Sequence, residues 1–182
     1  MPDERGIPMP NSRRQFLGAG LSAAVAGSAI SCGASHGASP WRFFTAEEGR
    51  TVDAICEQIV PADRDPGAKE ARVVNYIDIQ LTRAFKRYQK AYREGIAAVD
   101  AASRKKFGRR FAELPAGQQT EVLTDIEKSS AAFFELILAH TRQGFYGDPR
   151  HGGNRNRVSW KMIGVPFPPI RGREHYDQLK VG

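Results

Sequence analysis

EARVVNYIDIQLTRAFKRYQKAYR, residues 70–93, carries the strongest periodic pattern of this sequence. Apolar residues recur every three or four positions and polar residues fill the other face, which predicts one amphipathic helix over Glu70–Arg93 that packs on a core. Gly95, just after this stretch, either breaks the helix or only bends it. A bend is the alternative because the 3.6-residue period of apolar positions continues toward Ser103. The apolar positions are Val73, Val74, Ile77, Leu81, Phe85, Tyr88 and Tyr92.

A second helix is predicted before this stretch. Thr45 and Glu48 have the spacing of a capping box, so the helix begins at Thr45. Pro61 ends it, and Asp65-Pro66-Gly67 is a turn signal in the loop that follows. Its apolar stripe consists of Val52, Ile55, Cys56, Ile59 and Val60.

Two further helices are predicted after an irregular piece over residues 107–114. Pro115 lies one position inside the first, where proline is favoured. The second runs over Ser130–Gln143, with Gly144 as its C-cap. No window alternates with period two, so the sequence predicts an all-α fold, a small bundle of four to five helices around one core.

The C-terminal segment, from Phe145 to Gly182, differs in composition from the helices. It is irregular and rich in Gly, Pro, Asn and aromatic residues, and it is far longer than an ordinary connection. Such a segment is ordered only if it packs on its own domain or on a partner, and both alternatives stay open. Its apolar anchors are Phe145, Tyr146, Trp160, Met162, Ile163 and Phe167.

Residues 1–32 have the order of a twin-arginine signal peptide: a pair of arginines, an apolar segment and small residues before a cysteine. The apolar run, residues 16–30, is shorter than the ~20 residues of a membrane span. The twin-arginine route exports proteins that are already folded, often with a partner attached. The residues that carry the signal are Arg13, Arg14, Phe16 and Leu17.

Cys32 has two interpretations. Ala29-Ile30-Ser31-Cys32 is similar to a lipobox, in which the cysteine is lipidated, and ordinary cleavage nearby is the alternative. Residues 33–44 are predicted to be a linker that ends in aromatic residues packed on the domain, and residues 45–182 form one helical domain. Cys56 is either a buried small residue or a half-cystine bonded to a partner chain.

The net charge is +7, with basic clusters over Arg83–Arg93 and Arg104–Arg110. Aromatic residues between these charges have the spacing of a helical core. An exported protein meets little nucleic acid, so we expect no nucleic-acid partner. A solvated face toward anionic lipid headgroups or an acidic partner fits the charges better.

The sequence has no dinucleotide-binding glycine motif and no haem-attachment motif, and its histidines lack metal-ligand spacing. We therefore expect no catalytic, cofactor or metal residues in this chain. His140, Asp148 and His151, with Asn154, are the one conceivable acid–base or metal cluster. A helix-end histidine and a loop histidine are the simpler interpretation.

Four pieces of the sequence resemble the small subunit (subunit 3, or gamma) of membrane-associated gluconate 2-dehydrogenase and related FAD-dependent dehydrogenases. The resemblance covers essentially all of the mature domain, and its most specific part is Gly-Phe-Tyr-x-Asp-Pro followed by Gly-Gly-Asn and then Trp-x-x-Ile-Gly. The pieces are SRRQFL in the leader, ICEQIVPADRDPGAKEARVVNYIDIQL at residues 55–81, FFELILAHTRQGFYGDPRHGGN at residues 133–154 and SWKMIGVPF at residues 159–167.

The resemblance implies a helical, non-catalytic partner of a large GMC-type flavoprotein. In that family the large subunit binds FAD and oxidises a sugar, sugar acid or polyol, and a cytochrome c subunit carries haem c. The small subunit carries the export signal for the flavoprotein, which implies a periplasmic, membrane-associated complex, held by the complex or by a lipid on Cys32. We expect the partner to contact Phe145, Tyr146, Asn154 and Trp160, unless these residues only seal their own core.

Two other functions stay open. The first is a lipid-anchored periplasmic binding module without a flavoprotein partner. The second is an enzyme that uses His140, Asp148 and His151.

Overall fold

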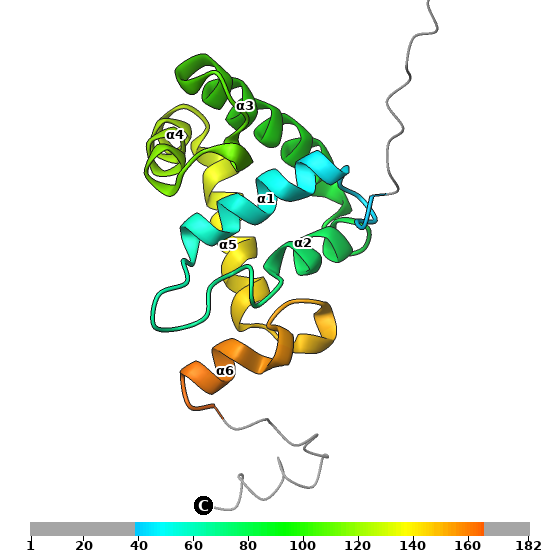
Figure 1. Cartoon of the computed structure of the whole chain (residues 1–182). Coiled ribbons are helices and arrows are strands. Elements are labelled where there is room, and N and C mark those ends of the chain that lie inside the picture. Colours follow the sequence, from blue (N-terminus) through cyan, green and yellow to red (C-terminus); the bar gives the residue numbers. More distant parts are fainter. Residues whose placement is uncertain (1–38, 166–182) are drawn as a thin grey trace, which may run out of the picture. The chain divides into compact units, whose positions relative to one another are not determined.

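A computed structural model describes residues 39–165 of the chain. The leader with its arginines, Cys32 and the last part of the C-terminal segment lie outside the described residues. Within them the chain folds into α-helices and short 3₁₀ turns without strands, which confirms the predicted all-α class (Figure 1). The helices are α1 (Ala46–Ile59), α2 (Val73–Leu81), α3 (Gln89–Phe107), α4 (Ala116–Ser129), α5 (Ala131–Tyr146) and α6 (Val158–Met162).

Helix α5 lies at the centre of the bundle and packs against each of the other five helices (Figure 1). Its inward face meets the apolar stripes of α1 and α2, because the periodic apolar positions of all three turn toward one core. No helix in the described range is both long and apolar enough to span a bilayer. Fully buried core residues include Val52, Ile55, Val73, Ile77, Leu81, Tyr92 and Phe145.

The single helix predicted over Glu70–Arg93 is wrong, because the chain turns a corner inside it. Helix α2 ends at Leu81, a turn and a 3₁₀ segment (Lys86–Tyr88) follow, and α3 begins at Gln89. The Thr82 hydroxyl donates to the Ile79 carbonyl, and the Gln89 side-chain amide donates to the Leu81 carbonyl (2.9 Å). These two carbonyls at the end of α2 therefore find partners nearby. The apolar residues on both sides of the corner still reach one core.

Gly144 is not a C-cap, contrary to the prediction. Helix α5 continues to Tyr146, and Gly147 caps it. A Cβ on Gly144 would lie 2.9 Å from the Tyr76 ring and 3.0 Å from the Val73 side chain, so the glycine lets α2 approach α5 closely. Gly95 likewise neither ends nor breaks a helix, because α3 runs through it against Phe133.

The predicted start of α1 is confirmed. The Glu48 amide donates to the Thr45 hydroxyl (3.2 Å) and the Thr45 amide donates to the Glu48 carboxylate (2.9 Å), which completes the capping box. Pro115, by contrast, is the N-cap of α4 and lies one residue before the predicted position. Differences of one residue are usual at helix ends.

The aromatic end of the predicted linker packs on the domain, as expected. Phe44 is fully buried, and Trp41 and Phe43 are half-buried against the core. The buried Asp78 carboxylate holds this segment, because it accepts three backbone N–H bonds, from Arg42 (2.7 Å), Phe43 (2.9 Å) and Phe44 (3.1 Å). These bonds explain how an acid is accommodated in the interior.

Candidate partner-binding surface

The described part of the C-terminal segment, residues 147–165, folds back on the end of α5. Asn154 is fully buried and its amide donates to the Gly147 carbonyl (2.9 Å), while its carbonyl oxygen accepts from the Ser159 amide (3.1 Å). The Ser159 hydroxyl donates to the Phe145 carbonyl (2.6 Å). These bonds tie α6 to α5, so this part of the segment packs on its own domain.

Two glycines of the segment, Gly152 and Gly153, allow it to pack closely on the rest of the chain. A Cβ on Gly153 would lie 2.2 Å from the Gly144 carbonyl oxygen, so no larger residue fits between the segment and α5. Gly152 has φ +101°, a conformation that strains residues with a side chain. The close backbone approach at Gly153 therefore occurs within the chain itself.

The structure separates the four residues that were expected to contact a partner. Phe145 and Asn154 are fully buried inside their own fold, so the expectation that they anchor a partner is corrected for these two. Tyr146 is 45% exposed. Trp160 is half-buried, and its indole N–H donates to the Tyr146 carbonyl (2.7 Å). The partner contact through Tyr146 and Trp160 stays a prediction.

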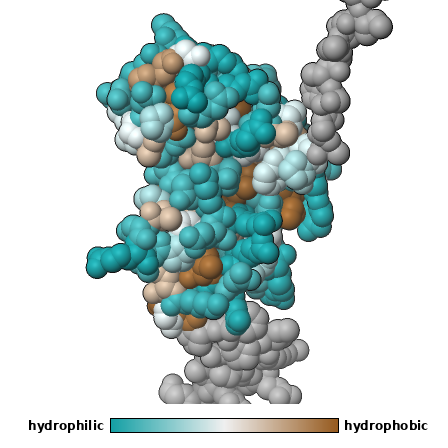
Figure 2. Space-filling model, in the orientation of Figure 1, coloured by the Kyte–Doolittle hydropathy of each residue, from teal (hydrophilic) through white to brown (hydrophobic). Residues whose placement is uncertain are grey.

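Exposed apolar side chains gather at this end of the described chain. Its large exposed hydrophobic residues are Tyr146 (45%), Ile163 (51%) and Val165 (43%), and all three belong to the end of α5 or follow α6. With Trp160 they form what we call the apolar end surface. Figure 2 shows hydrophobic atoms in the lower part of the view, where Figure 1 places α6. Apolar surface that gathers in one place indicates a contact site.

The chain does not assemble His140, Asp148 and His151 into an acid–base or metal site. His140 belongs to α5 and its side chain is buried. The imidazole stacks on the Phe85 ring (4.0 Å between centroids), and its Nδ1 lies 2.9 Å from the Tyr92 hydroxyl. Asp148 instead binds Arg150 (2.7 Å), and His151 is exposed. In residues 39–165, no group of three or more His, Cys, Asp or Glu side chains is arranged to hold a metal.

The sequence model of one family, gluconate 2-dehydrogenase subunit 3, matches residues 46–166, a range that contains every helix described above. The chain belongs to the gluconate 2-dehydrogenase subunit 3 family. No curated protein and no solved structure matches it. The matched range ends next to Val165, so the apolar end surface is part of the subunit 3 domain.

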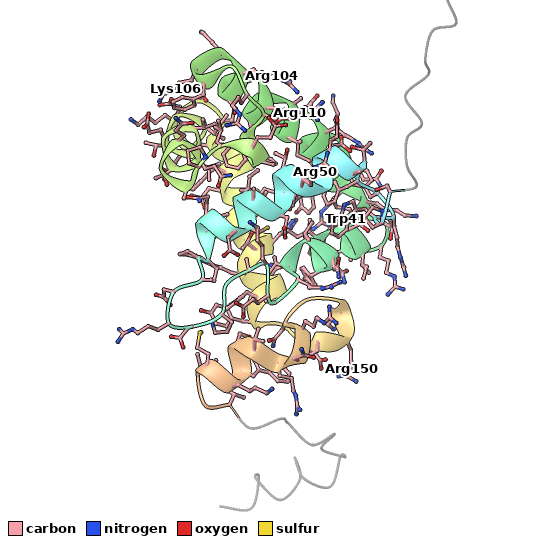
Figure 3. All side chains as sticks on the ribbon, viewed as in Figure 1. Trp41, Arg50, Arg104, Lys106, Arg110 and Arg150 are labelled. Carbon is pink, nitrogen blue, oxygen red and sulfur yellow. The ribbon has the colours of Figure 1, made fainter. Side chains whose placement is uncertain are left out.

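Most of the second basic cluster of this subunit 3 domain is engaged within the fold. Lys106 binds Asp125 (3.0 Å) and Glu121 (3.2 Å), and Arg110 binds Glu47, whose pKa the guanidinium lowers. Figure 3 shows Arg104, Lys106 and Arg110 at the end of the bundle away from Arg150. The paired charges favour a solvated face that is neutralised mainly by the chain's own acids.

Cys56 of the subunit 3 domain is a buried small residue. Its side chain is fully enclosed, its sulfur lies 3.3 Å from the Thr141 hydroxyl, and burial raises the pKa of the thiol to about 12. A bond to a partner chain would need an accessible sulfur. The half-cystine alternative is therefore wrong.

Sequence reasoning missed two residues that shape this subunit 3 domain. Asp78 fixes the segment before α1, and its one sequence signal is an acid inside the apolar run YIDIQL. Val165 belongs to the apolar end surface but has no sequence signal, because exposure depends on how α6 is placed.

Proposed function

We propose that this chain is the non-catalytic small subunit of an exported FAD-dependent dehydrogenase that oxidises a sugar, sugar acid or polyol. It escorts the flavoprotein subunit through the twin-arginine route and stabilises it afterwards. The observation that carries the proposal is the apolar end surface on a domain of the subunit 3 family. Tyr146, Ile163 and Val165 lose contact with water when the flavoprotein covers them, and that burial favours association.

Three buried titratable groups support an accessory role. Burial raises the pKa of Cys56 to about 12 and lowers that of His140 to about 4, and it raises the pKa of Tyr92 well above its ordinary value. Acid–base catalysis needs a group whose pKa lies near the working pH. All three groups are held uncharged instead, so they suit a packed interior. In the proposed complex the flavoprotein supplies FAD and a cytochrome c subunit supplies haem c.

The leader supports the escort role. Arg13 and Arg14 begin a twin-arginine signal, and this route accepts folded proteins, so a flavoprotein that lacks its own signal can leave bound to this chain. The complex then resides in the periplasm, held at the membrane by its other subunits or by a lipid on Cys32.

Co-expression with the candidate flavoprotein tests the proposal. The chain, tagged at its C-terminus, is recovered from gently solubilised membranes, and the absorption spectrum of the eluate is recorded. We expect a large second chain with flavin bands, and oxidation of sugars, sugar acids or polyols by the eluate. Replacing Arg13 and Arg14 by lysine should leave both chains in the cytoplasm.

Two results would contradict the proposal. An active flavoprotein in the periplasm of cells that lack this chain would exclude the escort role. A colourless protein without a partner would favour a lipid-anchored binding module instead.

A further inference from the structure

A polar pocket of about 360 Å³ lies between the start of α2 and the loop that follows α5. Arg72 and Asn75 line it on one side, and Gly152, Arg155 and Asn156 line it on the other. The Arg155 amide donates to the Ala71 carbonyl (3.0 Å), which joins the two sides. The pocket is separate from the buried His140 and from the apolar end surface.

The charge of the pocket is positive and is not neutralised by its own lining. Arg72 and Arg155 contribute two guanidinium groups, and no acidic residue lines the cavity. Within residues 39–165, neither arginine forms an ion pair, whereas Arg93, Arg110 and other basic residues do. Arg72 acts on the Asp53 carboxyl only through its longer-range charge, and Asp53 lies outside the lining. Two like charges at one concavity favour an anion between them.

The backbone around the pocket is held in conformations that few residues adopt. Four residues other than glycine have positive φ in the described range: Arg72 (52°), Asn154 (43°), Asn156 (57°) and Arg157 (59°). All of them flank the pocket or belong to the loop that forms it. Such conformations persist where the surroundings enforce them, as the buried Asn154 does here through its two side-chain bonds. The arginines therefore start from backbone positions fixed before any ligand arrives.

We propose that this pocket binds a small oxyanion, a carboxylate or phosphate group, through Arg72 and Arg155. Each planar guanidinium presents N–H donors that match two oxygens of such a group, and charge-assisted bonds of this kind are the strong ones. Asn75 and Asn156 supply further amide donors at the rim. The site takes an anion whether or not a flavoprotein is bound.

Titration of the full, ¹⁵N-labelled chain with sodium acetate and with inorganic phosphate tests the proposal. Sodium chloride keeps the ionic strength constant, because salt screens exposed charges. We expect saturable shifts of the Gly152 and Gly153 amide signals with at least one of the two anions. Saturation by acetate alone identifies a carboxylate site, and saturation by phosphate alone identifies a phosphate site.

Two variants and one matched control locate the binding. Arg72→Gly removes a guanidinium and places glycine where the backbone is left-handed, so the fold is kept. Arg155→Gln changes only the other side chain. Each should weaken binding at least fivefold. Arg83→Gln removes an equal charge from an exposed position after the opposite end of α2 and should leave binding unchanged.

Three outcomes would overturn the site. The first is amide-signal shifts that never saturate as the anion is added. The second is an affinity for the anion that neither Arg72→Gly nor Arg155→Gln alters. The third is a loss of affinity in Arg83→Gln as large as in those two variants. Each would mean that anions respond to the net charge of the chain alone. Because the titration uses no flavoprotein, none of these results bears on the proposed subunit function.

Discussion

Asp78 shows how one buried side chain positions a whole segment. Its carboxylate accepts backbone N–H bonds from Arg42, Phe43 and Phe44. In Asp78→Asn the charge is lost and one oxygen is replaced by an NH₂ group that faces donors. We expect the free energy of unfolding to fall by about 2–3 kcal/mol. Urea denaturation followed by circular dichroism measures it.

Asp125→Asn is the matched control for that substitution. Asp125 also accepts a charged bond, from Lys106, but both side chains are largely exposed. Exposed pairs contribute little, so we expect a change of less than about 1 kcal/mol. Equal losses in the two variants would show that the buried carboxylate does not hold residues 42–44.

His140 makes the stability of the domain depend on pH. Burial, helped by the nearby charge of Arg87, lowers its pKa from 6.5 to about 4. Between those two values the unfolded chain binds a proton that the folded chain does not, so stability is full above pH 6.5 and declines as the pH falls toward 4. The decline from this group is at most about 1.4 kcal/mol per pH unit.

A non-titrating residue isolates that effect. In His140→Gln the part of the pH dependence that comes from this position should vanish, although the variant starts from a lower stability because the ring stack with Phe85 is lost. Urea denaturation at several pH values between 4 and 7.5 compares the two slopes. Equal slopes would mean that His140 is protonated alike in the folded and unfolded chains.

At the level of whole helices, replacing two different glycines by alanine should change the free energy of unfolding in opposite directions. In Gly95→Ala the new Cβ would lie 2.2–2.4 Å from the Phe133 ring, so α3 and α5 are forced apart. We expect a loss of about 1–3 kcal/mol, the usual range for overpacking. Thermal and urea denaturation report the change.

Gly117→Ala is the control, because a Cβ at this exposed position in the first turn of α4 would meet nothing within 4 Å. Alanine is a better helix former than glycine, so we expect a gain of about 0.5–1 kcal/mol. A stabilised Gly95→Ala would contradict the close packing of α3 on α5.

For the molecule as a whole, a substitution on the apolar end surface should weaken binding of the flavoprotein. Ile163→Asp places a charge on this surface at an exposed position, so folding should be little affected while the flavoprotein binds at least tenfold more weakly. Ala131→Asp adds the same charge at the exposed start of α5, the opposite end of that helix, and should not alter binding. Co-purification of the two chains and their dissociation constant provide the measurement.

Full recovery of the complex with Ile163→Asp would move the interface elsewhere on the chain. The groove lined by Gln58, Leu123 and Phe134 would then be the next surface to test.

The order of residues alone was enough to predict the helical class and the capping box of α1. It also predicted that the apolar stripes of the helices face one core. These features depend on neighbours within about four positions, which the sequence displays directly. The motifs GFYGDP and GGN carried the family resemblance in the same way, and the family match confirms it. The lack of period-two alternation predicted that no sheet forms, and residues 39–165 contain no strand.

Other features came from contacts between residues distant in the chain. The 3.6-residue period continues across the corner at residues 82–88, so it cannot reveal that α2 and α3 are separate. A glycine required for close packing, as Gly144 is, looks the same in the sequence as one required for a turn. Phe145 and Asn154 become buried, and Arg72 and Arg155 come to line one pocket, only when the C-terminal segment packs against α2 and α5. Burial and charge clustering depend on what surrounds a residue in space, so the sequence does not display them.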